Sequence, residues 1–256
     1  MIHKYSDIHP DAKIGNNVTI EAFTSIAKNV TIGDGTWIGS NVNIMEGAII
    51  GKNCKIFPGA VISAIPQDLK FAGEITTTEI GDNTTIRECV TINRGTIDKH
   101  KTVVGSNCLL MAYVHIGHDC IIGNNVILAN TVGIAGHVEI EDFVILEGFV
   151  GVQQFLKIGA HAFVAGGSLI RKNVPPFVKA AREPLSYVGI NSVGLRRRGY
   201  TNEQILQIED IYRTIYVKDY NITNAVNVVE LEAPATKEKD QILRFIRESV
   251  NGIMRG

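Results

Sequence analysis

Residues 116–140, IGHDCIIGNNVILANTVGIAGHVEI, carry an aliphatic residue at every sixth position. The same spacing runs in phase over 8–62 and 104–170, with a short run at 80–92 between them. A period of six fits neither an α-helix nor a simple strand. It is typical of a parallel β-helix, in which three hexads close one triangular coil and the aliphatic residues stack inside. Gly, Asn and Asp between the aliphatic positions are the residues that tight turns require.

The sequence therefore predicts a mainly β protein with two domains. Residues 1–184 are expected to form a parallel β-helix, left-handed because it resembles the hexapeptide-repeat class. Regular coiling should end at Val174-Pro-Pro, since two successive prolines cannot continue a ladder. Residues 185–256 are expected to form a small α-helical C-terminal domain. There Thr201-Asn-Glu-Gln is a capping box, and Thr223 and Thr236 are expected N-caps.

Two segments interrupt the repeat, 66–79 and 97–103. Both are predicted to be loops that leave the coil, and loops on a rigid scaffold are where binding residues concentrate. The alternative is a tolerated insertion without a role, which fits the short, charged second segment better than the first.

Composition narrows the classes of function. The net charge is −1 at pH 7, so no global field favours nucleic acid or an anionic membrane. No apolar run is long enough to span a bilayer, and the first residues contain no apolar signal segment. The cysteines form no Cys-x-x-Cys pair, and three occupy packing positions: Cys54, Cys108 and Cys120. We therefore expect a cytoplasmic protein with no disulfide, metal site, nucleic-acid partner or integral membrane segment.

Stacking arithmetic brings several polar residues together. Residues eighteen apart lie above one another in successive coils, so His118, Gly136 and Gln154 form one column, and Asp119 and His137 form the next. Three interpretations of this polar strip are open: ordinary turn residues, a zinc site or a general base. The histidine spacing does not match the His-x4-His ligands of hexapeptide-repeat carbonic anhydrases, which weighs against zinc.

A general base accounts for the strip as a whole. The imidazole of His118 suits deprotonation of a hydroxyl at neutral pH, and Asp119 can orient the ring. Gly136 lets a reacting carbonyl approach the backbone, where an N–H can hold an oxyanion. Together these residues predict acyl transfer.

Four motifs point to one family: His115-Ile-Gly-His-Asp-Cys, Ala135-Gly-His-Val, Gln67-Asp-Leu-Lys-Phe-Ala-Gly-Glu and Gly194-Leu-Arg-Arg-Arg-Gly-Tyr. They resemble the UDP-N-acetylglucosamine O-acyltransferases of lipid A biosynthesis, over essentially the whole chain. The resemblance implies an enzyme that moves an acyl group from acyl carrier protein to the 3-hydroxyl of UDP-N-acetylglucosamine. A long 3-hydroxyacyl chain is expected.

The resemblance also implies a role for each matching residue. His118 would be the base, Asp119 its orienting acid and Gly136 the oxyanion donor. The UDP-sugar or the acyl group would be bound by Gln67, Asp68, Lys70, His115, His137, Gln153 and Gln154. The phosphates and the phosphopantetheine arm would be held by Asn191, Arg197 and Arg198. The acyl length would be set at Gly166, where Gly148 one coil below leaves a bare groove.

The family further implies a homotrimer with its sites between subunits, in which Lys70 and His118 come from different chains. No cofactor is expected beyond the 4′-phosphopantetheine that acyl carrier protein carries. The chain departs from the family where Gln153 and Asn93 replace histidines. Glutamine can still bind substrate, but it cannot carry a proton.

Three rival functions are open on the sequence. An N-acyltransferase of the same pathway generally has an additional N-terminal domain, whereas this chain enters its hexads by Ile8. A coenzyme A-dependent acetyltransferase is disfavoured by the first loop and by the basic run Arg196-Arg-Arg. A structural or ice-binding β-helix needs a regular threonine array, and Thr19, Thr31 and Thr91 are too scattered.

Overall fold

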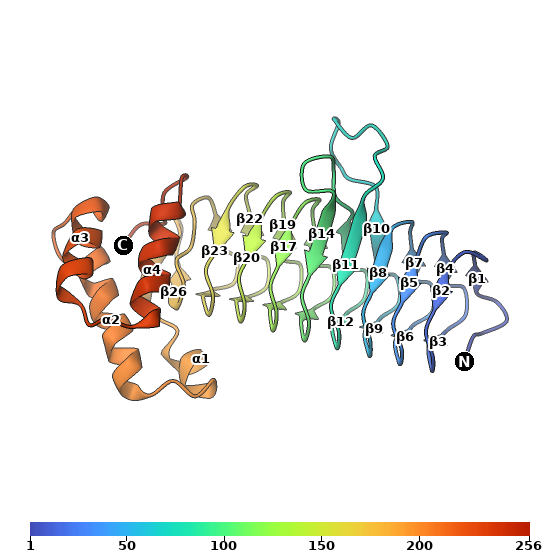
Figure 1. Cartoon of the computed structure of the whole chain (residues 1–256), viewed down its shortest axis with the longest axis horizontal. Coiled ribbons are helices and arrows are strands. Elements are labelled where there is room, and N and C mark those ends of the chain that lie inside the picture. The colour runs from blue at the N-terminus through green and yellow to red at the C-terminus, as the bar shows by residue number, and fades with distance from the viewer.

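The computed structural model describes residues 1–256 and shows a long triangular prism followed by four helices (Figure 1). Each hexad of the regular runs forms one short strand that contains the predicted aliphatic residue, in most cases as its last residue. From Ile20 onward these residues are buried, and they pair in parallel with the equivalent residue of the next coil, as Ile116 does with Ile134. The predicted hexapeptide repeat is thereby confirmed strand by strand.

Three parallel sheets form the faces of the prism. The first sheet contains β1 (Asp7–Ile8), β4 (Ser25–Ile26), β7 (Asn43–Ile44), β10 (Val61–Ala64), β13 (Thr91–Asn93), β16 (His115–Ile116), β19 (Gly133–Ile134), β22 (Gly151–Val152) and β25 (Leu169–Ile170). The second contains β2 (Lys13–Ile14), β5 (Thr31–Ile32), β8 (Ala48–Ile50), β11 (Thr77–Ile80), β14 (Lys101–Val104), β17 (Ile121–Ile122), β20 (Glu139–Ile140) and β23 (Lys157–Ile158). The third contains β3 (Thr19–Ile20), β6 (Trp37–Ile38), β9 (Lys55–Ile56), β12 (Thr85–Ile86), β15 (Leu109–Leu110), β18 (Ile127–Leu128), β21 (Ile145–Leu146), β24 (Phe163–Val164), β26 (Val178–Ala181) and β27 (Ser186–Ile190).

The chain turns a corner between successive sheets, and these corners stack into three edges. We call the corner from the first sheet to the second the first edge, the corner from second to third the second edge, and the corner from third to first the third edge. Many corners contain a residue with a left-handed backbone, such as Asn53 and Asn125 with φ of 53° and 57°. Asparagine tolerates this conformation, which explains its frequency between the aliphatic positions.

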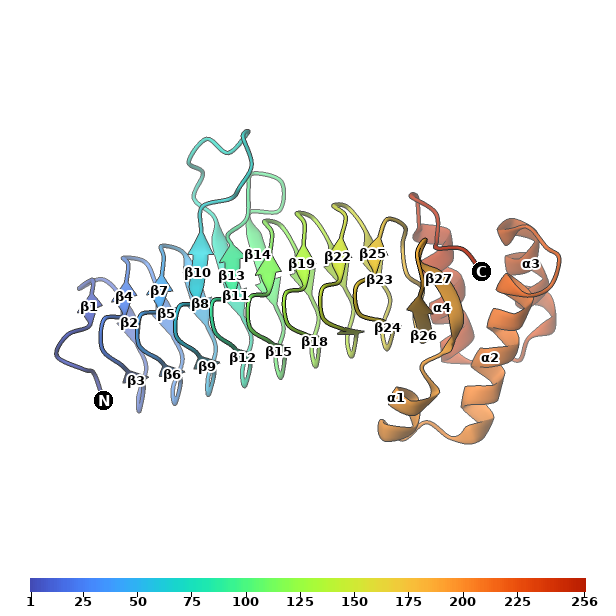
Figure 2. The ribbon, with the colours of Figure 1, turned by 180° about the vertical axis from the view of Figure 1, so that it is seen from behind.

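Both interruptions are loops that leave the first edge, and they project side by side from the prism (Figures 1 and 2). The first loop ends earlier than predicted, because β11 begins at Thr77. The second loop keeps its predicted length but lies three residues earlier, over 94–100, between the end of β13 and the start of β14. The two loops are joined at their bases, where the Thr77 N–H donates to the His100 carbonyl at 3.0 Å.

The prediction that coiling ends at Val174-Pro-Pro was wrong. Val174 still pairs with Ile158, and β26 then continues the parallel ladder against β24. The prolines are tolerated because they occupy a corner, where Gly159 and Phe177 provide the ladder N–H groups instead. β27 adds an antiparallel strand, so the third sheet continues past the predicted domain boundary at 184/185.

Four helices follow: α1 (Ser192–Arg197), α2 (Asn202–Tyr216), α3 (Ile222–Glu232) and α4 (Lys237–Glu248). The capping box at Thr201 and the N-cap at Thr236 are confirmed. Thr223 is not an N-cap, because Asn221 caps α3 by accepting from the Asn224 N–H. The sequence offered both residues, and asparagine is at least as good a cap as threonine.

One apolar core runs through the prism into the helices, with Tyr212 of α2 fully buried against its end. The Tyr212 hydroxyl donates to the Pro176 carbonyl at 2.6 Å, so the helical segment is anchored to the last coils. None of the four helices combines the length and the apolar character that crossing a membrane requires.

Candidate active site

The predicted column on the first edge is confirmed. β16 and β19 pair His115 with Gly133, which places His118 directly above Gly136 in the next coil. A Cβ on Gly136 would lie 2.7 Å from Cε1 and Nε2 of His118, so the imidazole occupies the space that a side chain would need. Glycine at 136 therefore leaves room for the His118 ring, a reason for glycine that the sequence did not reveal.

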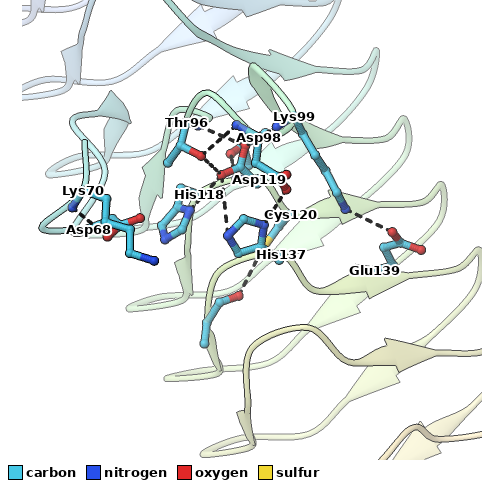
Figure 3. A network of polar contacts seen from close by, with 12 residues as sticks. Asp68, Lys70, Thr96, Asp98, Lys99, His118, Asp119, Cys120, His137 and Glu139 are labelled. Atoms are coloured by element: carbon cyan, nitrogen blue, oxygen red, sulfur yellow. Dashed lines mark hydrogen bonds and ion pairs between the residues drawn. The ribbon is translucent and has the colours of Figure 1, made fainter. Parts of the chain in front are cut away.

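His118 and Asp119 form a close pair (Figure 3). Nδ1 of His118 lies 2.8 Å from Oδ2 of Asp119, whose carboxylate is fully buried. This contact directs Nε2 of His118 away from the carboxylate, and Nε2 has no hydrogen-bond partner within the chain. A ring nitrogen held in this way can accept a proton from a bound hydroxyl.

Three further donors hold the Asp119 carboxylate, and all come from the second loop. The N–H groups of Thr96 and Lys99 donate to Oδ1 at 3.0 and 3.1 Å, and the Thr96 hydroxyl donates to Oδ2 at 2.6 Å. Burial by itself would raise the pKa of Asp119, but these hydrogen bonds and His118 outweigh it and lower the pKa. Asp119 therefore remains a carboxylate at neutral pH.

His137 faces two carboxylates. Its Nδ1 lies 3.1 Å from Oδ2 of Asp98, as an ion-pair contact that lacks hydrogen-bond geometry, and its Nε2 lies 3.9 Å from Oδ2 of Asp119. The ring stacks on Phe155 at 4.4 Å and meets His118 edge to face at 4.9 Å. The column predicted for Asp119 and His137 is thus confirmed, whereas the contribution of Asp98 was missed.

The backbone N–H of Gly136 is free. At the corresponding hexad positions of the second edge, side-chain oxygens accept the N–H groups of Asn16, Lys52, Ser106 and Asn124. No acceptor within the chain takes the N–H of Gly136. A free donor beside the His118 ring suits an oxyanion.

The group His118, Asp119 and His137 also has the spacing of a metal site, with ligand atoms within 4.8 Å of one another. The chemistry of Asp119 does not fit this use. Each carboxylate oxygen already accepts two hydrogen bonds, so a cation would have to displace at least one of them. These three residues therefore do not fit a metal ion.

His115 lies on the first sheet beside this edge. Its Nδ1 lies 2.8 Å from the Thr91 hydroxyl, and burial, followed by the charge of His118, lowers its pKa. His115 and the exposed Gln153 line an open groove whose floor is made by the bare strand positions Gly133 and Gly151. Gln154 follows Gln153 and is also exposed.

The first loop carries Gln67, Asp68 and Lys70 to the same edge. The Asp68 carboxylate accepts from the Lys70 N–H at 3.0 Å, and Gln67 and the Lys70 side chain are exposed. Figure 3 shows Asp68 and Lys70 on the same side of the prism as His118. Lys70 and His118 of one chain thus lie at the same edge of the prism.

Asn191, Arg197 and Arg198 lie elsewhere, at the second edge and the neighbouring third sheet. Asn191 caps α1 and donates from Nδ2 to the His161 carbonyl at 2.9 Å. Arg198 donates to the Phe143 carbonyl at 3.1 Å, and Arg197 lines a pocket over β21 and β24 with Asn191.

An aromatic column supports this second group. His161 stacks between Phe143 and Phe177 at centroid distances of 4.9 and 5.5 Å, and Tyr200 packs edge-on against His161. Burial, and then the charge of Arg198, lowers the pKa of His161 to about 4. The ring is therefore neutral at pH 7. The eighteen-residue spacing of Phe143 and His161 was a sequence signal that went unused.

Gly166 lies at the third edge, directly above Gly148, as predicted. Its φ is not in the left-handed region, and its added Cβ would meet only the Gly148 carbonyl closely, at 3.2 Å. Turn geometry therefore does not demand glycine at this position, and an exposed bare surface remains there.

Comparisons with known proteins agree with this geometry. The family described as "Udp N-acetylglucosamine O-acyltransferase; Domain 2" matches residues 173–254, and the bacterial transferase hexapeptide repeat matches 29–64 and 101–136. An acyl-[acyl-carrier-protein]–UDP-N-acetylglucosamine O-acyltransferase from Chlorobium phaeobacteroides is 56% identical over 252 residues, which cover 98% of this chain and 96% of the relative. One from Herminiimonas arsenicoxydans is 43% identical and covers 100% and 99%.

Solved structures extend the likeness. A UDP-N-acetylglucosamine acyltransferase from Bacteroides fragilis superposes with a TM-score of 0.98 at 49% identity and covers both chains completely. This likeness and the repeat match support the predicted fold class, a left-handed parallel β-helix with a small helical C-terminal domain. The rival functions are set aside, since the identity extends over the whole length of relatives that share one name. The chain belongs to the UDP-N-acetylglucosamine O-acyltransferase family.

Proposed function

We propose that this enzyme transfers an acyl group from acyl carrier protein to the 3-hydroxyl of UDP-N-acetylglucosamine at the first edge, with His118 as general base. The observation that carries the proposal is the buried Asp119 carboxylate 2.8 Å from Nδ1 of His118, next to the free N–H of Gly136. Asp119 fixes the ring and stabilises the imidazolium that forms. The arrangement supplies a base and an oxyanion donor at stacked corners of two successive coils.

The reaction needs only these groups and the two substrates. Nε2 of His118 takes the hydroxyl proton as the sugar oxygen attacks the thioester carbonyl carbon. The carbonyl oxygen then carries negative charge, which the Gly136 N–H stabilises. The intermediate collapses as the C–S bond breaks, and the proton passes from His118 to the sulfur of phosphopantetheine. The products are the 3-O-acyl sugar nucleotide and the free thiol.

The test of the base is His118→Ala. We expect kcat to fall about 10²–10⁴-fold with an unchanged melting temperature, the usual contribution of a positioned base. His9→Ala, at the opposite end of the prism, is the matched control and should retain full activity. Turnover within a few fold of the wild type in well-folded His118→Ala would exclude His118 as the base.

We further propose that the active assembly is a homotrimer. The candidate residues lie on three different edges of one prism, with His118 on the first, Arg197 near the second and Gly166 on the third. One copy cannot bring its own edges together, but a second copy can place its second or third edge against the first edge of its neighbour.

Mixing inactive chains tests this assembly. His118→Ala and Arg197→Ala chains, combined and reassembled at equal concentration, should recover about a quarter of wild-type activity if each site takes one residue from each neighbour. Sedimentation should show three copies. A monomer, or a mixture without recovery, would contradict the trimer and leave the test of His118 unaffected.

A cytoplasmic location is also part of the proposal. All four cysteines are free thiols, and Cys54, Cys108 and Cys120 are buried in the core as the sequence predicted. Free thiols are typical of a reducing compartment. Fractionation of cells that express the native protein tests this location.

A further inference from the structure

The second loop does more than interrupt the repeat. It returns to the prism through five contacts that join segments distant in sequence. Thr96 and Lys99 make three hydrogen bonds to Asp119, Asp98 contacts His137, and the Lys99 ammonium lies 3.0 Å from Glu139 of β20. Figure 3 shows this loop bent over the Asp119 carboxylate. A tolerated insertion would have no reason to place four polar groups on one site.

We propose that the second loop, 94–100, is a clamp that positions the reacting histidine, with Thr96 as the positioning residue that acts on His118 through Asp119. This inference rests on the proposed function, because it assigns the loop a role in the work of that base. The loop itself contacts neither the hydroxyl nor the thioester in the mechanism above.

The geometry singles out Thr96. Its side chain is buried, and it donates twice to one carboxylate, from the backbone to Oδ1 and from the hydroxyl to Oδ2. Oδ2 is also the oxygen that His118 contacts, so the hydroxyl fixes the same atom that orients the ring. The coil supplies no comparable donor, since Thr102 accepts from the Asp119 backbone N–H and does not reach its carboxylate.

The electrostatic surroundings support the same role. Asp119 faces His118 and, at 3.9 Å, His137, while the Lys99 ammonium turns away to Glu139. No lysine or arginine side chain pairs directly with the carboxylate. Hydrogen bonds from Thr96 are among the causes that lower the pKa of Asp119. Removal of the hydroxyl should raise that pKa and loosen the ring.

The test compares Thr96→Val, which keeps the shape and removes the hydroxyl, with Thr96→Ser, which keeps the hydroxyl. We expect Thr96→Val to lower kcat about 10–100-fold, the effect of one hydrogen bond to a charged group, with little change in the KM of either substrate. The acid limb of its kcat/KM profile should move to higher pH. Thr96→Ser should restore both the rate and the profile.

Thr36→Val is the matched control. Thr36 is a fully buried threonine in another coil whose hydroxyl donates to Gly51 and accepts from the Cys54 N–H. If lost stability alone lowers activity, Thr36→Val will do so equally. In an Asp119→Ala background, Thr96→Val should have no further effect on kcat.

Two outcomes would overturn the clamp. One is a wild-type rate and pH profile in Thr96→Val. The other is a loss that persists in the Asp119→Ala background or is matched by Thr36→Val. Both are distinguishable from failure of the proposed function, which would appear as an active His118→Ala enzyme.

Discussion

Gly136→Ala tests the stacking of His118 on the glycine below it. The added Cβ would lie 2.7 Å from Cε1 and Nε2 of His118, whereas ordinary contact begins at 3.4 Å. The ring must therefore withdraw by about 0.7 Å, and a misplacement near 1 Å typically costs about 10²-fold in rate. Asp119 holds Nδ1 at 2.8 Å, so the ring cannot move without lengthening that contact as well.

We expect Gly136→Ala to lower kcat about 100-fold while the melting temperature changes little. The backbone at Gly136 is not left-handed, so alanine introduces no conformational strain there, and the N–H proposed to hold the oxyanion is kept. The measurement is steady-state turnover of an acyl carrier protein thioester with UDP-N-acetylglucosamine, together with a crystal structure of the variant.

Gly39→Ala is the control at another corner, where the added Cβ would lie 3.0 Å from side-chain atoms of Pro58 and Trp37 and would crowd no candidate site residue. It should turn over at the wild-type rate. Wild-type turnover in Gly136→Ala, or a loss equal to that of Gly39→Ala, would refute the argument that the glycine makes room for the base. An unmoved His118 ring in the variant structure would refute it directly.

Two other predictions concern the third edge, at Gly166, and the second edge, at His161. Gly166→Met should shift the preferred donor from long to shorter acyl chains, by several fold per carbon at about 0.8 kcal/mol per methylene, and an equal loss on all donors would contradict this. The free energy of unfolding should fall as the pH is lowered from 6.5 to about 4, because unfolded chains bind a proton at His161 that the folded protein excludes. The fall is at most about 3 kcal/mol. His161→Phe, which keeps the aromatic column, should remove this part of the pH dependence of the unfolding free energy, measured by urea denaturation at each pH. An unchanged pH dependence in His161→Phe would contradict this prediction.

Counting in sixes predicted most of the fold because each coil repeats the environment of the last. The stacking of His118 on Gly136 and the pairing of Asp119 with His137 follow from that count alone. Corners obey different rules from strands, which explains the error at the prolines: a corner does not need the N–H that proline lacks.

Loops lie outside the count. Thr96 contacts Asp119 from 23 residues away in the sequence, and Asp98 contacts His137. Both contacts start in a loop to which the six-residue period does not apply. The sequence showed only a short charged segment, whose contacts depend on how the loop bends back over the edge. Hydrogen bonds to the buried Asp119 carboxylate fix the conformation of the second loop, and these bonds can be recognised only when the position of that carboxylate is known.

The distribution of the candidate residues over three edges has a consequence for specificity. The six-residue count groups side chains by edge, whereas the proposed reaction would draw on the base of the first edge, the arginines near the second and the groove of the third. In the proposed trimer these edges belong to neighbouring copies, so the Gly166 proposed to limit the acyl chain need not share a chain with the His118 proposed as the base. Donor length would then depend on the packing between copies as well as on the residue at 166.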